Sequence, residues 1–229
     1  MPLNRVTDHS NMYQFITHTW NPLAGKCPHS CNYCSTNKFY YSVLKDKYSG
    51  PIRIVEKELK TNLGENNFIF VAAQNDLFAN DVPSKYIERI LKYCKKFDKN
   101  KYLFQSKNPG RILEFIDRLP NDSVICTTIE TNRYNNPYIC YAPSPFARAI
   151  DMNKINFPKY VTIEPIMQFD LKEMVDLIKI CSPIQTNLGA DSGGNNLIEP
   201  TKEEVFKLVE ELKKFTKVEL KKNLNRIIK

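Results

Sequence analysis

The stretch FITHTWNPLAGKCPHSCNYC, residues 15–34, joins an expected β-strand to a loop that carries three cysteines within eight positions. Residues 15–20 are rich in β-branched and aromatic side chains, which are typical of strands. Cys27 and Cys31 are separated by three residues, and Cys31 and Cys34 by two. Thiols this close together can form a disulfide, a zinc site or an iron–sulfur site. The remainder of the chain decides among these uses.

The composition indicates a globular protein with reduced thiols. The chain has 229 residues, of which 42% are apolar, enough for one sizeable domain or two small ones. Since no apolar run approaches the ~20 residues of a membrane span, we expect no membrane segment. The N-terminus lacks the basic start and apolar block of a secretory signal, so we expect a cytoplasmic location. Seven cysteines, an odd number, also disfavour a disulfide framework.

The charge is positive, at +8, from 33 basic and 25 acidic side chains. A basic surface can favour nucleic acid or another polyanion. Scattered lysines in a chain rich in Lys, Asn and Ile explain the same excess as ordinary solvated surface. Residues 202–229 hold nine basic and five acidic side chains, so +4 lies in one segment. This segment is either a solvated helix face or an edge that faces a polyanion.

Strand-like and helix-like patterns alternate along the chain. Strands are predicted at 15–20, 67–73, 101–106, 123–130, 159–165 and 184–190, with 217–220 as a candidate seventh, and helices at 83–97, 108–119, 171–181 and 201–215. The last helix opens with a Thr-x-x-Glu capping box. Alternation predicts an α/β fold with a mainly parallel sheet and outer helices. Because a full barrel takes ~250 residues, we predict a partial, TIM-like (β/α)6–7 barrel. We expect one domain over 1–229, with the cysteine loop at 21–39 and a C-terminal helix and strand extension at about 200–229.

Polar clusters follow the predicted strands. They comprise QND at 74–76, SKNP at 106–109, ETNR at 130–133, EP at 164–165 and ADSGG at 190–194. In α/β folds the chemistry gathers at the C-terminal ends of the strands. These clusters and the cysteine loop are therefore expected to meet at one rim.

The remaining cysteines bear on the choice of metal. Structural zinc sites close with four ligands, usually as two pairs, and no second pair occurs here. Cys94, Cys126 and Cys181 are expected in the core, whereas Cys140 lies in a loop rich in proline and tyrosine. His29 could complete a zinc site of three cysteines and one histidine. An iron–sulfur cluster held by three thiolates would instead leave one iron open to a substrate or cofactor.

The cysteine motif resembles that of the radical S-adenosylmethionine (SAM) superfamily, in which an aromatic residue usually precedes the third cysteine, as Tyr33 does here. Further segments, over about residues 15–225, are similar to a phage-associated radical-SAM-like family of unknown function, itself a distant relative of the spore photoproduct lyases. In chain order they are TWNPLAGKCPHSCNYC, FVAAQNDLF, FQSKNPGRI, TTIETNR, YVTIEPI, LGADSG and VELKKNL.

This resemblance implies a mechanism. Cys27, Cys31 and Cys34 would hold a four-iron four-sulfur (4Fe–4S) cluster whose open iron binds the amino and carboxylate groups of SAM. One electron would cleave the sulfonium, and the resulting 5′-deoxyadenosyl radical would abstract hydrogen from a substrate. The electron would come from an external reductant such as flavodoxin or ferredoxin. The protein would orient the cofactors and exclude water.

The resemblance also implies cofactor contacts near the cluster. Tyr33 would lie near the adenine of SAM. The Gly-Gly-Glu-like segment of many members is replaced by small and polar residues, and either Gln74 or Asp76 would accept the SAM amino group. Asp76 can equally cap the turn that follows. The segment comprises Ala72, Ala73, Gln74, Asn75 and Asp76.

Further contacts are implied at the rim. Thr128, Glu130, Asn132 and Arg133 would meet the SAM ribose or carboxylate. A carboxylate prefers a cationic partner, and Lys107, Arg133 and Arg148 are the candidates, although each could form an ordinary ion pair. Glu164 ends an apolar strand, where a charge is costly without partners, and Asn187 with Asp191 and Ser192 closes the rim.

The substrate stays open. The net charge, the aromatic loop at 133–146 and the lyase-like kinship favour a nucleic acid or nucleotide, with a peptide or small molecule as the rival. The loop itself could be a lid, a stacking platform or simple packing. A hypothesis from another class is a zinc-stabilised nucleic-acid-binding module without catalysis. The sequence gives no indication of the oligomeric state.

Overall fold

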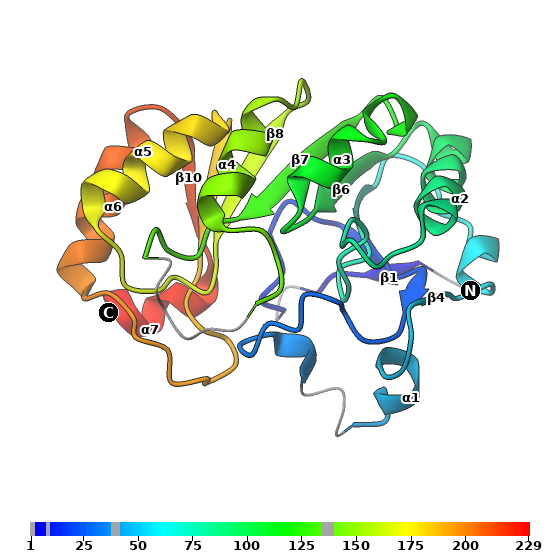
Figure 1. Ribbon diagram of the computed structural model, residues 1–229, viewed down its shortest axis with the longest axis horizontal. Helices are drawn as coiled ribbons and strands as arrows, with labels where there is room; N and C mark the ends of the chain where they lie inside the picture. The colour runs from blue at the N-terminus through cyan, green and yellow to red at the C-terminus, as the bar shows by residue number, and fades with distance from the viewer. Residues whose placement is uncertain (1–2, 8–9, 38–41, 134–139) are drawn as a thin grey trace.

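An eight-stranded sheet forms the centre of the computed structural model (Figure 1), which describes residues 3–7, 10–37, 42–133 and 140–229. The antiparallel edge strand β1 is followed by seven parallel strands in the order β2-β5-β6-β7-β8-β9-β10. The bounds are β1 Asn4–Arg5, β2 His18–Trp20, β5 Phe68–Val71, β6 Lys101–Gln105, β7 Ser123–Thr128, β8 Lys159–Ile163, β9 Gln185–Leu188 and β10 Lys217–Leu220. The predicted α/β, TIM-like partial barrel is confirmed.

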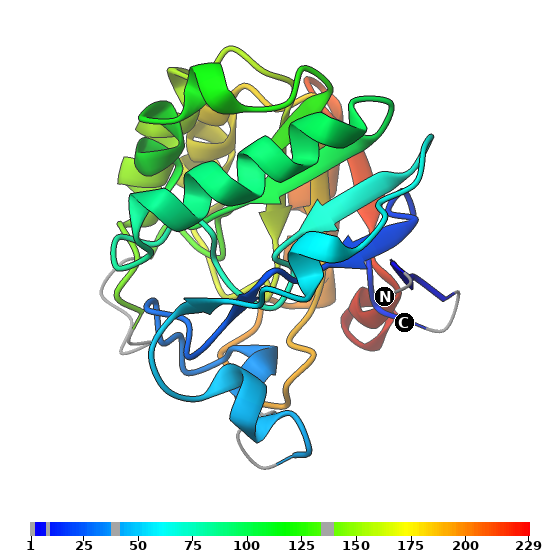
Figure 2. The same ribbon diagram turned by 90° about the vertical axis from the view of Figure 1, so that its right-hand side faces the viewer.

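Helices cover the outer side of this sheet, and Figures 1 and 2 show them as an arc around the strands. The loops around helix α1 (Lys45–Tyr48), in lighter blue, lie below the sheet in both views. The longer helices are α2 Ser84–Cys94, α3 Pro109–Leu113, α4 Pro145–Asn153, α5 Leu171–Cys181 and α6 Lys202–Lys213. Shorter elements are α1 Lys45–Tyr48, α7 Asn225–Ile228, the 3-10 turns η2 Glu58–Lys60, η3 Lys95–Phe97, η4 Ile116–Arg118 and η5 Lys222–Leu224, and a two-stranded antiparallel sheet of β3 Leu23–Ala24 and β4 Arg53–Ile54.

Two apolar clusters hold the sheet in place. The larger lies between the strands and the outer helices and includes Trp20, Cys94 and Cys181. The smaller covers the inner side of the sheet, where Tyr13 and Ile16 of the N-terminal segment pack against Phe70, Leu103, Val124 and Cys126. The N-terminal segment therefore fills part of the space that opposing strands fill in a closed barrel. The prediction that Cys94, Cys126 and Cys181 are buried is confirmed.

The element predictions were right where a long periodic pattern supports them. The helix at 171–181 matches α5, whereas the one at 108–119 is broken into α3 and η4. The helix α4 was missed, although Ser144 accepts a hydrogen bond from Ala147 N as its N-cap and Pro145 occupies the first turn. In the expected aromatic loop at 133–146, residues 134–139 lie outside the described residues.

The described helices are all too short or too polar to cross a bilayer.

The capping box of α6 is formed as predicted and can be tested. Thr201 Oγ1 accepts from Glu204 N at 3.2 Å, and Glu204 Oε2 accepts from Thr201 N at 2.7 Å. Because Thr201→Ala leaves the Glu204 N–H without this partner, we expect the free energy of unfolding to fall by about 1 kcal/mol. Urea unfolding measures this change. Thr201→Ser keeps the hydroxyl and should retain the stability, so equal losses in both variants would contradict the cap.

Candidate active site

A cavity of about 170 Å³ opens at the C-terminal ends of β5, β6 and β7 and collects most of the predicted site. All three motif cysteines line this cavity. Tyr33, which was expected near the adenine of SAM, lines it as well. The predicted residues on its wall are Cys27, Cys31, Tyr33, Cys34, Ala73, Gln74, Asn75, Asp76, Lys107 and Thr128. The expectation that the cysteine loop meets the ends of later strands at one rim therefore holds for the strands β5 to β7.

The turn after β5 is tied to the chain that leads into the cysteine loop. Ala72, directly after the strand, adopts a left-handed backbone conformation with φ of 56°. The backbone N of Gln74 donates to Asn21 Oδ1 at 3.1 Å, and Asn75 Nδ2 donates to the carbonyl of Gly25 at 3.0 Å. These bonds hold the turn beside the loop, so both contribute walls to the same cavity.

Asp76 is a buried hub between the cysteine loop and β6. Its Oδ1 accepts from Phe78 N at 3.0 Å and Ser106 Oγ at 2.7 Å, and its Oδ2 accepts from Lys107 N at 2.8 Å and lies 2.9 Å from His29 Nε2. Burial alone would raise the pKa of Asp76, but the bonds with His29 and its neighbours outweigh it and lower the pKa. Both oxygens are fully engaged, and the bond to Phe78 N is the turn cap that the sequence suggested.

Glu130 is a second hub, with only 3% of its surface exposed. Its Oε1 accepts from Lys107 Nζ at 2.6 Å and from the hydroxyl of Tyr33, and its Oε2 accepts from Arg148 Nη1 at 2.8 Å. Burial opposes ionisation, but Arg148 and Lys107 more than offset it and lower the pKa of Glu130. One carboxylate thus meets two cations, so these three side chains together carry an excess positive charge beside the cysteines.

Lys107 brings this excess positive charge close to the cysteine loop. Lys107 Nζ lies 3.5 Å from Cys31 Sγ and 4.4 Å from the centre of the Tyr33 ring. Burial would lower the pKa of Lys107, but Glu130 outweighs it and raises the pKa, so the ammonium stays charged. Burial raises the pKa of the Tyr33 hydroxyl, which therefore donates as a neutral phenol.

The thiols themselves are held in different surroundings. Burial and then Asp76 raise the pKa of Cys27 to about 12. Cys31 Sγ lies 2.8 Å from the sulfur of Cys140, and this contact raises the pKa of Cys31 while it lowers that of Cys140. Cys34 Sγ lies 2.9 Å from Thr36 Oγ1. A thiol must lose its proton before it binds a metal. Because the pKa of the buried Cys27 is raised, this thiol requires a strong electrophile to lose its proton.

The type of donor suits an iron–sulfur cluster. Three soft thiols share one wall of an open cavity, with a fixed ammonium beside them. In the part of the chain that the structure describes, no three His, Cys, Asp or Glu side chains converge as a single metal ion requires. His29, which could have completed a zinc site, bonds to Asp76 instead.

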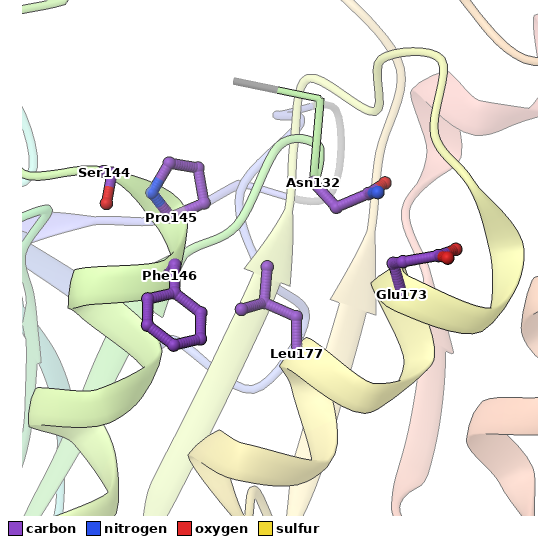
Figure 3. A pocket seen from close by; sticks show the side chains of 6 residues that line it. All are labelled: Asn132, Ser144, Pro145, Phe146, Glu173 and Leu177. Carbon is purple, nitrogen blue, oxygen red and sulfur yellow. The ribbon is translucent and has the colours of Figure 1, made fainter. Parts of the chain in front are cut away.

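Two predicted cofactor residues lie away from this cavity. Arg133 pairs with Asp170 at the surface, at 2.7 Å, and Asn132 Oδ1 accepts from the backbone N of Asp170 at 2.9 Å. Asn132 lines a separate hollow of about 530 Å³ between α4 and α5 (Figure 3), with Phe146 and Leu177. Because β7 ends at Thr128, the chain has already turned outward at these positions.

Glu164 and Asn187 also lie outside the cysteine cavity. Glu164 has the partners that its burial requires, because it accepts from Lys221 Nζ at 2.5 Å and Asn223 Nδ2 at 2.9 Å. Gly189 leaves the room for this group, since a Cβ there would lie 2.7 Å from the Glu164 carboxyl carbon. Asn187 accepts from Gln185 Nε2 at 2.8 Å and lines another cavity of about 260 Å³.

Sequence reasoning missed the contacts that two residues make at the site. Arg148 was expected to bind a carboxylate of the cofactor, but it is buried and bonds to Glu130, to the carbonyl of Thr128 at 2.9 Å and to that of Pro143 at 2.7 Å. Cys140 lies against Cys31 although 109 positions separate them. No local pattern in the sequence could signal either contact.

Comparisons with known proteins agree with this α/β fold. Residues 10–181 match the family described as "Protein of unknown function (DUF5131)". The chain therefore belongs to this family. No curated protein matches the sequence.

Solved structures of spore photoproduct lyase share the fold. A variant with a dinucleoside spore photoproduct aligns with a TM-score of 0.63 and 12% identity, over 96% of this chain and 80% of the other. Another variant, with bound AdoMet (SAM) and the dinucleoside spore photoproduct, aligns with a TM-score of 0.55 and 15% identity, over 93% and 66%. At such low identity the likeness shows a common fold.

The Glu130 hub leads to a stability prediction. Glu130→Gln removes the one negative charge between two buried cations, and breaking a buried pair in this way costs about 3 kcal/mol or more. We expect that loss in the free energy of unfolding, measured with urea.

Asp170→Asn is the matched control, because it breaks the exposed pair with Arg133 and should change stability little. If both variants lost the same small amount, Glu130 would not be the hub described.

Proposed function

We propose that the protein is a radical SAM enzyme. A 4Fe–4S cluster on Cys27, Cys31 and Cys34 would serve the reductive cleavage of SAM, and the 5′-deoxyadenosyl radical would abstract hydrogen from a substrate. The observation that carries this proposal is the gathering of the three motif cysteines, Tyr33 and the 72–76 turn around one cavity at the C-terminal edge of a partial barrel. The fold shared with an AdoMet-bound spore photoproduct lyase supports it.

The division of labour follows from the cavity. When bound by the three cysteines, the cluster would supply the electron for the cleavage of SAM. The chain supplies the three thiolates and the positive charge of Lys107 near them. Most of the protein's contribution is thus positioning and electrostatics.

Lys107 is the best candidate for the SAM carboxylate. Among the three cations considered, it alone lines the cavity. Arg133 is committed to Asp170 at the surface, and Arg148 to Glu130 and two carbonyls. Lys107 Nζ already donates to Glu130 and Tyr33. Its remaining contact is the weak one of 3.5 Å with Cys31 Sγ, so a carboxylate can approach Nζ from that side.

Gln74 is the better candidate for the SAM amino group. The carboxylate of Asp76 is filled by its own network, whereas the Gln74 side chain lines the cavity and has no hydrogen-bond partner among the described residues. The small side chain of Ala73 leaves room beside Gln74, and Asn75 Nδ2 donates to the carbonyl of Gly25. We assign Asp76 to the positioning of the cysteine loop.

The remaining residues take different roles. Thr128 accepts from Gln105 at 3.3 Å on the cavity wall, and its position suits a ribose hydroxyl. Tyr33 can meet the adenine only by its edge or the face away from Lys107. Glu130 positions Lys107 and Tyr33. We assign no cofactor contact to Asn132, Arg133, Glu164 or Asn187, which lie outside this cavity.

For the substrate we propose a nucleic acid or nucleotide. The net charge of +8 supports this, as does the dinucleoside spore photoproduct bound by the lyases of the same fold. A single domain over residues 1–229, an external reductant such as flavodoxin or ferredoxin, and a cytoplasmic location stay predictions from the sequence.

The cluster assignment predicts a metal content. After anaerobic reconstitution with iron and sulfide, the protein should hold about four irons per chain, as a 4Fe–4S cluster requires. Replacing Cys27, Cys31 or Cys34 by Ala should remove most of that iron. Cys181→Ala, in the core of α5, should keep it. One zinc without iron, or motif variants that retain iron, would refute the assignment.

The role of Lys107 predicts a loss of cofactor affinity. Because a charge-assisted bond is worth ~1.5–3 kcal/mol, Lys107→Met in the cluster-loaded protein should raise the dissociation constant of SAM about tenfold or more. Equilibrium dialysis with labelled SAM measures this value.

Arg133→Met removes a cation of equal charge at the surface and should leave the dissociation constant unchanged. A Lys107→Met protein that is correctly folded and binds SAM as tightly as the wild type would show that another group holds the carboxylate.

A further inference from the structure

The cysteine loop has a sulfur neighbour that the proposed function does not use. Cys140 Sγ lies 2.8 Å from Cys31 Sγ. Tyr33 and Met167 are buried around this pair, and Leu197 packs against it from outside. Cys140 is not among the residues that line the cavity shared by the three motif cysteines.

A backbone hydrogen bond, in addition to side-chain packing, holds Cys140 against Cys31. Tyr141, the residue after Cys140, donates from its backbone N to the carbonyl of His29 at 2.9 Å. His29 stands two positions before Cys31 and is itself held by Asp76 at 2.9 Å. A disulfide has an S–S distance of about 2.05 Å, so the two sulfurs need to close by only ~0.8 Å.

The pair is selective. Across residues 3–7, 10–37, 42–133 and 140–229, no other two sulfurs lie within hydrogen-bonding distance of each other. Cys34 contacts Thr36, and Cys94, Cys126 and Cys181 are buried in the core. An oxidant that acts on the folded, metal-free chain therefore meets one ready-made dithiol.

We propose that Cys31 and Cys140 form a reversible disulfide that excludes the cluster. This proposal rests on the proposed function, because Cys31 is a ligand there. A sulfur joined to Cys140 has no thiolate to offer to iron. Conversely, a Cys31 bound to iron is not available for the disulfide. The oxidised pair is thus a cluster-free, inactive state, and a dithiol reductant returns it to the state that accepts iron.

The oxidation balances with oxidised glutathione as the oxidant. The Cys140 thiolate attacks one glutathione sulfur, the glutathione S–S bond breaks, and one glutathione thiolate leaves. The Cys31 thiolate then attacks the Cys140 sulfur of the mixed disulfide and releases the second glutathione. Two protein thiols lose two electrons, two glutathione molecules are formed, and the two protein protons pass to them. Cytosolic disulfides of this kind usually sense redox state rather than stabilise a fold.

Peptide mapping tests the disulfide directly. Metal-free protein is treated with oxidised glutathione, blocked with iodoacetamide and digested with trypsin without reduction. We expect the peptide 27–38 linked to the peptide 134–148, which contain Cys31 and Cys140. Cys31→Ala and Cys140→Ser should each abolish the link, whereas Cys181→Ser should preserve it.

Cluster-loaded protein provides the competition arm. Iron on Cys31 should slow the formation of the link at least about tenfold relative to the metal-free protein. A metal-free wild type without the link, a link that survives Cys31→Ala, or equal rates in the two forms would overturn the proposal. If the reduced protein binds no iron, the proposed function fails instead, and the peptide map of the metal-free wild type still decides whether the disulfide forms.

Discussion

The position of the cysteine loop depends on one buried carboxylate. Glu130 stands just beyond the end of β7 and binds Lys107 from the turn after β6, Tyr33 from the cysteine loop and Arg148 from α4. A buried charge is tolerated only when ion-pair and hydrogen-bond partners satisfy it, because an unpaired buried charge carries the full free-energy cost of desolvation. The bonds of this one carboxylate therefore hold four separate segments together beside the cavity.

Asp76 plays a similar part on the other side of the cavity. It joins His29 of the cysteine loop to Ser106 and Lys107 after β6. The two hubs hold the loop from both sides and leave its thiols at an open space. Since Lys107 and Arg148 outweigh Glu130, this group of side chains carries an excess positive charge beside Cys31, which suits the carboxylate of a bound cofactor.

Much of the fold was accessible from the sequence because its signals are local. Buried parallel strands such as β7 appear as apolar runs, and α5 shows a clear helical period. The cysteine motif, Tyr33 and the 72–76 turn were also identified correctly as neighbours. The direction of a side chain after a strand is not local, so Asn132 and Arg133 were placed at the cavity although the chain turns outward. Cys140 and the bracing role of Arg148 depend on tertiary contacts that no spacing reveals.

The central claim is that three thiolates leave one iron free for SAM. Electron paramagnetic resonance of the reduced, cluster-loaded protein, recorded with and without SAM, tests this most directly. A cluster with an open iron should give a spectrum whose g-values shift when SAM is added. Identical spectra in a protein that holds its full iron, or the lack of any iron–sulfur signal after reconstitution, would contradict the account.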